Sequence, residues 1–224
     1  VDGFGIFDPR GRERGQPMPL WILITLCVVG ALVVIVAVLS ALAPTRVEYT
    51  ETIDINAPRA QVYDDIRLQE RLMRWSAWPA ETKSTCAVDE SHGADGTVGA
   101  RTVFFTKGKR IGHQEVVGLS DQTDVSMTLV GPGPPHHPEL TFTLTQIAPR
   151  QTRVAAHFVN RLPRPFNAIW RFAGLSAWTR QMHVKDLQGL KAFSEPPHRD
   201  ATGAIVGHPP SGENPFQHKA TQAA

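Results

Sequence analysis

Three histidines are the first candidates for acid–base chemistry, because an imidazole group titrates near neutral pH. His113, His157 and His183 all lie in segments with a regular pattern of apolar residues. Within residues 152–160 the apolar side chains share one face and His157 lies on the other, so we expect His157 to point toward water. His183 follows a helix face and has no evident carboxylate partner. We therefore interpret all three as structural residues.

Carboxylates are the second group suited to a reaction. The candidates are Glu51, Asp64, Asp65, Asp89 and Glu115. Catalysis by two carboxylates needs a pair whose surroundings hold their two pKa values apart. No two of these five share a face with a neighbour that would do so, and we expect all five at the surface.

The sequence indicates neither a metal site nor an activated nucleophile. His136 and His137 are adjacent, but a metal would need further ligands from elsewhere in the chain. No serine lies in a Gly-x-Ser-x-Gly sequence, and no glycine-rich loop suits a phosphate. Cys27 and Cys86 fall in segments that are not expected to meet, which argues against a disulfide. We predict no catalytic residue, no metal site and no cofactor.

Length and charge narrow the classes of function. The chain has 224 residues, of which 42% are hydrophobic, and its formal net charge is +2. This length suits one domain with appendages, and the apolar content is sufficient for a core. No basic stripe with interleaved aromatic residues is present, so we do not expect a nucleic-acid partner.

A segment near the N-terminus is long and apolar enough to cross a membrane. Residues 20–43 carry no charged side chain, and roughly 20 residues suffice for a helix to span the hydrocarbon layer. Trp21 suits one interface and Pro44 ends the helix at the other. The alternative is a cleaved signal peptide, because Ala41-Leu42-Ala43 resembles a cleavage site. The apolar run exceeds what a signal peptide needs and Pro44 would hinder cleavage, so we favour a transmembrane helix.

Arginines on the two flanks of this segment predict its orientation. Arg10, Arg12 and Arg14 precede it, whereas Arg46 and Arg59 follow it. An excess of positive charge on the short flank favours the cytoplasmic side. We therefore expect a single-pass protein of the cell inner membrane, with its folded domain in the periplasm or outside the cell.

Seven strands and two short helices are predicted to follow. Residues 47–55 alternate between apolar and polar side chains, which is typical of a strand with one exposed face. Asn56 or Ala57 is expected to cap a helix with Pro58 in its first turn, and a second helix is expected over residues 69–74. Short connections rich in Gly, Asp and Pro indicate antiparallel hairpins. The other strands are predicted over residues 83–89, 100–106, 110–118, 124–130, 140–147 and 152–160.

The folded region is expected to end in one long helix over residues 162–195, or in two helices joined at Gly174. Prolines near both ends mark its bounds, and apolar residues recur every three or four positions along it. Such a helix needs an apolar surface to cover its buried side. In residues 124–130 and 140–147 the apolar side chains share one parity, so one face of the sheet supplies that surface.

This order of segments resembles the SRPBCC superfamily, also called START-like or Bet v 1-like, and within it the polyketide cyclase/dehydrase-like branch. The matching pieces are residues 53–58 with Val62-Tyr63, then 75–78, 96–100 and 186–193. The resemblance implies an α+β helix-grip fold. In this fold a curved antiparallel sheet wraps around the C-terminal helix and leaves an apolar cavity between the sheet and the helix. The superfamily has no common catalytic residues, so none is carried over to this chain.

The resemblance and the apolar segment together give the expected organisation. We predict a flexible tail over residues 1–19, a transmembrane helix over 20–43, a helix-grip domain over 47–195 and a disordered tail over 196–224.

The favoured function is a membrane-anchored binding module for a hydrophobic small molecule, such as a lipid, a quinone or a polyketide-like compound. The alternatives are an accessory or assembly subunit that binds other subunits of a membrane complex, and an enzyme of the polyketide cyclase/dehydrase type. The residues expected to face the cavity are Phe104, Met127, Phe142, Phe158, Trp170 and Leu187.

Overall fold

The computed structural model describes residues 19–131 and 137–195. The tails predicted for residues 1–19 and 196–224 lie outside these ranges except for Pro19. Most of the proline-rich connection over residues 131–138 also lies outside them.

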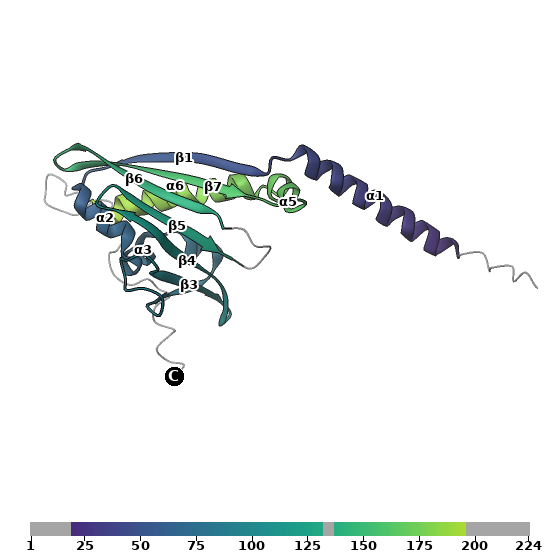
Figure 1. Cartoon of the computed structure of the whole chain (residues 1–224), viewed down its shortest axis with the longest axis horizontal. Coiled ribbons are helices and arrows are strands. Elements are labelled where there is room, and N and C mark those ends of the chain that lie inside the picture. Colours follow the sequence, from purple (N-terminus) through teal and green to yellow (C-terminus); the bar gives the residue numbers. More distant parts are fainter. Residues whose placement is uncertain (1–18, 132–136, 196–224) are drawn as a thin grey trace, which may run out of the picture.

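One antiparallel sheet of seven strands forms the frame of the domain (Figure 1). Its order is β1-β7-β6-β5-β4-β3-β2, so the first strand pairs with the last and the other six form a meander. The seven predicted strands are thus confirmed as elements of one sheet. They are β1 (Arg46–Ile55), β2 (Thr85–Asp89), β3 (Arg101–Thr106), β4 (Lys109–Ser120), β5 (Asp124–Val130), β6 (Glu139–Ala148) and β7 (Gln151–Arg161).

The helices after β1 gather on one side of this sheet. The C-terminal helix α6 (Leu175–Ser194) lies along the inner face of the curved sheet, and α2 (Arg59–Arg67) and α3 (Gln69–Trp75) lie beside its C-terminal half (Figure 1). A short helix α4 (Trp78–Thr82) follows α3 and was not predicted. This arrangement is an α+β helix-grip fold, as expected from the sequence.

The predicted apolar face of the sheet packs against α6. Inward-facing side chains alternate along the strands with exposed ones, as the period of two requires. Removing these side chains from water stabilises the folded state by about 25 cal/mol per Å² of buried apolar surface. Members of this core include Val125, Met127, Phe142, Leu144, Val154 and Ala156 from the sheet and Leu187 and Leu190 from α6.

The terminal helical region consists of two helices, one of the two arrangements left open by the sequence. Helix α5 (Phe166–Phe172) precedes α6, and Gly174 between them has a φ of +74°. A left-handed backbone of this kind suits glycine, which lacks a Cβ. The bond between Arg164 and Pro165 is cis, and the first helix begins at Phe166 rather than at residue 162.

Other bounds differ from prediction by one or two residues, for local reasons. The second strand begins at Thr85 rather than at residue 83, because Lys83 adopts a left-handed conformation that ends α4. Asn56 or Ala57 was expected to cap the first short helix, but the cap is Pro58 and the helix begins at Arg59.

The apolar segment near the N-terminus forms helix α1 (Leu20–Leu42), which extends away from the domain (Figure 1). It ends one residue early because Ala43, which precedes Pro44, is already extended. By length and composition it is able to span a membrane, and a signal sequence meets the same criteria. Cys27 in this helix and Cys86 in β2 are both free thiols.

Candidate ligand-binding cavity

A small cavity lies between the N-terminal half of α6 and strands β4 to β7. Its volume is about 80 Å³, whereas pockets for drug-sized ligands measure roughly 300–1,000 Å³. Wider hollows beside α2 and along β1 are open and lined largely by charged or polar side chains, so they do not enclose an apolar ligand. The cavity wall consists of Ser76, Trp78, Gln114, Met127, Thr128, Leu129, Pro138, Leu140, Phe158, Trp170, Trp178, Thr179, His183 and Asp186.

Tryptophan and phenylalanine rings make up much of this wall. The ring centroids of Trp78 and Trp178 are 5.7 Å apart with an interplanar angle of 61°. The ring centroids of Phe158 and His183 are 4.9 Å apart. Trp170 reaches the same space from α5. These rings come from four elements, so the apolar wall exists only once α4, α5, α6 and β7 are assembled.

The six residues predicted to face the cavity occupy three kinds of position. Met127, Phe158 and Trp170 line it. Phe104 lies behind the wall, with its ring centroid 6.2 Å from that of Trp78. Phe142 and Leu187 belong to the packed core instead. Both lie at a greater distance from α5, in the region where side chains of α2 and α3 fill the space between α6 and the sheet.

A row of polar side chains on α6 also faces the cavity, and it was not predicted from the sequence. Thr179, His183 and Asp186 are four and three positions apart, a spacing that places them on one helix face. All three are buried. The regular spacing was visible in the sequence, but the same spacing serves packed core positions, so it does not by itself predict a site.

His183 is an uncharged, buried imidazole. Burial lowers its pKa to about 4, and its Nδ1 lies 3.0 Å from the hydroxyl of Tyr49 on β1. Burial also raises the pKa of that hydroxyl, so the proton stays in place at neutral pH. This hydrogen bond uses Nδ1 and leaves Nε2 without a described partner, and His183 is one of the residues that line the cavity. The partner that the sequence did not reveal is therefore a tyrosine and not a carboxylate.

Asp186 is a buried carboxyl group at the cavity wall. Its Oδ1 accepts hydrogen bonds from the Ser76 hydroxyl at 3.0 Å and from the Ala77 backbone N–H at 2.7 Å. Burial raises its pKa to about 6, against a smaller lowering by these two bonds. Among the described residues no cation forms an ion pair with it. The group therefore titrates close to neutral pH and uses only one of its two oxygens.

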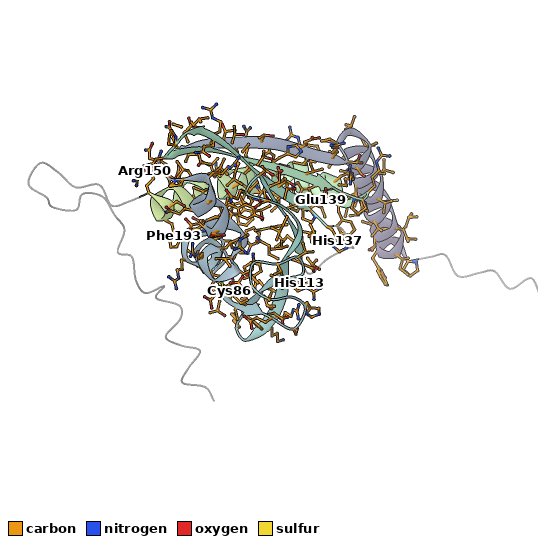
Figure 2. The ribbon with its side chains drawn as sticks, turned by 60° about the vertical axis from the view of Figure 1, so that its left-hand side comes forward. Cys86, His113, His137, Glu139, Arg150 and Phe193 are labelled. Carbon is orange, nitrogen blue, oxygen red and sulfur yellow. The ribbon has the colours of Figure 1, made fainter. Side chains whose placement is uncertain are left out.

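The other candidate histidines do not line the cavity, although Gln114, Pro138 and Phe158 beside them do. Figure 2 shows His113 and His137 at the opposite end of the sheet from Arg150. His113 contacts Arg110 and Glu115, and burial is the first cause of its lowered pKa. His157 is partly exposed, as expected, and bonds with Thr50. No group of three or more His, Cys, Asp or Glu residues able to hold a metal occurs in residues 19–131 and 137–195.

The prediction of five surface carboxylates was wrong for one of them. Asp65 is 3% exposed, because it lies on the side of α2 that faces α3 and α6. It accepts hydrogen bonds from Arg71 at 2.9 Å and from the Ser194 hydroxyl at 2.8 Å. A cation and a hydroxyl thus satisfy this buried charge, and it supports the fold.

Two fully buried asparagines differ sharply in their partners. Asn167 on α5 donates to the carbonyls of Ser40 and Ala43 at 2.8 and 2.9 Å and accepts from the Ser40 hydroxyl at 2.9 Å. Asn160 near the end of β7 is equally buried, yet neither its amide nitrogen nor its oxygen has a hydrogen-bond partner among the described residues. A buried amide without partners destabilises a fold.

We expect opposite effects from replacing these two asparagines with leucine. Asn160→Leu should raise the free energy of unfolding by about 1–3 kcal/mol, because it removes an unpaired buried amide of similar size. Asn167→Leu should lower the free energy of unfolding by a similar amount, because it leaves the Ser40 and Ala43 carbonyls unpaired. Urea unfolding of the detergent-purified full-length chain measures both. A loss of stability in Asn160→Leu would show that its amide has a partner in solution.

Comparisons with known proteins leave the family open. No family model and no curated protein matches the chain. Among solved structures, protein CV1439 from Chromobacterium violaceum has 16% identity and a TM-score of 0.49, covering 68% of this chain and 99% of its own. An Aha1 dimer from Colwellia psychrerythraea has 19% identity and a TM-score of 0.47, covering 66% and 96%. Protein TTHA0849 from Thermus thermophilus has 20% identity, a TM-score of 0.47 and coverage of 66% and 97%. These values describe an overall likeness and carry no functional conclusion.

Proposed function

We propose that this protein binds a hydrophobic small molecule with one polar group, and that α1 holds the binding domain at a membrane. The observation that carries the proposal is the composition of the cavity wall. Tryptophan, phenylalanine, methionine and leucine side chains enclose the space, and a few buried polar groups face it from α6. Ligand sites in proteins have this composition, in which apolar area supplies affinity and a few polar groups orient the ligand.

The polar groups define where the ligand's polar end would lie. Nε2 of His183 and the second carboxyl oxygen of Asp186 are not used by the hydrogen bonds described above. The indole N–H of Trp78 is buried and has no hydrogen-bond partner in the described part of the chain. A ligand hydroxyl would donate to the free Asp186 oxygen, and a ligand hydroxyl or carbonyl oxygen would accept from the Trp78 N–H. The apolar part of the ligand would lie against Trp170 and Trp178.

Ligand access requires the cavity to widen. About 80 Å³ accommodates a group of only a few heavy atoms. Trp170 and Trp178 lie on α5 and α6, on either side of the left-handed Gly174. Small changes in the backbone of this connection would move both rings apart, since hinges are often a few residues between elements. We place the route of the ligand there.

The anchor would keep the module close to its ligand. A lipid, a quinone or a polyketide-like compound dissolves in the bilayer, and a domain tethered to that bilayer meets it at high effective concentration. The three arginines before α1 support a periplasmic or extracellular domain on an inner-membrane anchor.

An enzyme of the polyketide cyclase/dehydrase type is the second candidate, and Asp186 is the observation that favours it. A carboxyl group with a pKa of about 6 at a cavity wall can exchange a proton with a bound ligand at neutral pH. Asp186→Asn separates the two functions. In an enzyme this substitution would reduce turnover far more than affinity, whereas a binding module has no turnover to lose.

Tryptophan fluorescence tests binding directly, because three of the five tryptophans line the cavity. The full-length chain carrying Trp21→Phe, purified in detergent, is titrated with a short-chain quinone and separately with a long-chain fatty acid. The proposal predicts a saturable change in emission with at least one of them. A change that rises linearly with concentration for both would indicate collision or detergent partitioning, and would contradict the proposed site.

A further inference from the structure

Helix α5 presents an apolar face that no other described element covers. Phe166, Ile169 and Phe172 are 41%, 56% and 55% exposed. They recur at every third position, which places them on one side of the helix. Three large apolar side chains at this exposure in seven residues are more than a water-facing helix needs, and such a patch marks an interaction surface.

The junction between α5 and α1 fixes the depth of this face relative to the bilayer. Asn167, fully buried between Phe166 and Ile169 in sequence, donates to the carbonyls of Ser40 and Ala43 at the C-terminal end of α1. The Leu162 backbone N–H also bonds to the Thr45 carbonyl at 2.8 Å. Helix α5 therefore lies beside the C-terminal end of α1, as Figure 1 shows.

The length of α1 places that end at the membrane surface. Its 23 residues extend about 35 Å at a rise of 1.5 Å each, against roughly 30 Å of hydrocarbon. With Trp21 at one interface, the last turn emerges at the other. Helix α5 then lies at the level of the lipid headgroups, where an amphipathic helix buries its apolar side.

The charges around α5 suit anionic lipids. Between positions 161 and 185 the sequence contains four arginines and one lysine, and no aspartate or glutamate. Three of these side chains, those of Arg161, Arg180 and Lys185, form ion pairs with Glu139, Glu51 and Glu81. The basic side chains left for lipid headgroups are those of Arg164 and Arg171. Arg164 and Arg171 flank or belong to α5 and are exposed. Basic side chains near the surface are attracted to anionic headgroups by about 1 kcal/mol each.

We infer that the face formed by Phe166, Ile169 and Phe172 inserts into the headgroup layer of the bilayer that α1 crosses, and that the route to the cavity opens there. Trp170, in the middle of α5, lines the cavity from the same short helix. The inference rests on the membrane anchor of the proposed function, and not on the identity of the ligand. It gives the bilayer a direct contact with the element that would move to admit a ligand.

Site-directed spin labelling of the full-length chain tests this arrangement. Cys27 and Cys86 are first changed to serine, and a single cysteine is then placed at Ile169, Val117 or Val33. The protein is reconstituted in vesicles of equal parts phosphatidylcholine and phosphatidylglycerol. Val117 on β4 is the matched control, since it is also apolar and is 45% exposed. Val33 in α1 is 62% exposed and reports the span itself.

The Ile169→Cys label should be more accessible to oxygen than to a water-soluble nickel relaxation agent, as in lipid, while the Val117→Cys label shows the reverse. If Val33→Cys is in lipid but Ile169→Cys behaves like Val117→Cys, the inference is overturned and the anchor stands. If Ile169→Cys is shielded from both agents, a protein covers this face and the inference is equally overturned. A Val33→Cys label exposed to water would overturn the anchor, and with it the inference, and would leave ligand binding by the domain to its own test.

Discussion

Replacing Asp186 with asparagine should make the folded chain more stable at neutral and alkaline pH. The pKa of this carboxyl group is raised by burial from an ordinary 3.8 to about 6, so ionisation is disfavoured in the folded state. This rise in pKa corresponds to about 3 kcal/mol. Asparagine keeps an oxygen for the Ser76 hydroxyl and the Ala77 N–H and carries no charge. The expected gain at pH 8 is therefore up to about 3 kcal/mol.

The pH dependence identifies the cause. Because the folded pKa lies above the unfolded one, the wild type is most stabilised by this group below about pH 4 and loses that contribution as the pH rises through about 6. The difference between variant and wild type should accordingly vanish at pH 4 and reach its full size above pH 7. Asp121→Asn on an exposed turn is the control and should shift stability by under about 0.5 kcal/mol at any pH. A variant less stable than the wild type at pH 8 would show that the ionised carboxylate is compensated.

Filling the cavity should weaken ligand binding and leave the fold intact. Thr179 lines the cavity from α6, is 6% exposed, and its hydroxyl donates only to the Leu175 carbonyl of its own helix at 2.8 Å. Thr179→Phe adds a ring to a space of about 80 Å³. A ligand would then have to displace that ring, at a cost of about 1–3 kcal/mol, which corresponds to affinity weakened by about 5- to 150-fold.

Thr179→Ala is the matched variant, since it loses the same hydroxyl and enlarges the cavity. It should bind the quinone or fatty acid probe at least as tightly as the wild type. Circular dichroism confirms that both variants remain folded before affinities are compared by the fluorescence titration. Equal affinities for Thr179→Phe and Thr179→Ala would place binding somewhere else in the molecule.

The fold was predictable because its elements repeat simple periods. Alternating side chains in residues 140–147 and the recurring apolar positions of residues 175–194 are local features that encode a sheet face and the helix that covers it. Gly174 could be identified as a hinge, since glycine is the residue that accepts a φ of +74°. Helix α4 was missed because its five residues include Trp78-Pro79, which also suits a turn.

The site was less predictable because it depends on contacts between residues far apart in the chain. Asp186 lies three positions from His183, and its polar side chain does not suggest burial. Its hydrogen-bond donors in the buried state are Ser76 and Ala77, which are 110 and 109 positions away. The Tyr49 partner of His183 is 134 positions away.

Aromatic residues in the sequence also do not distinguish a packed core position from a cavity wall. Phe142 belongs to the core and Phe158 lines the cavity. The two are near neighbours in the sheet, because Phe142 on β6 pairs with Ala156 on β7 and Phe158 lies two positions after Ala156. Only the placement of the helices over the sheet separates the two environments.

The proposed binding of a hydrophobic molecule is tested most directly by native mass spectrometry of the full-length chain, purified in a mild detergent from the cells that make it. We expect a mass increment from a bound small molecule that is present in the wild type, retained in Thr179→Ala and lost in Thr179→Phe. Release of that molecule by organic solvent then gives its chemical class. A wild-type chain that carries no small molecule and instead retains other protein subunits in fixed stoichiometry would contradict the account, and would indicate an accessory subunit of a membrane complex.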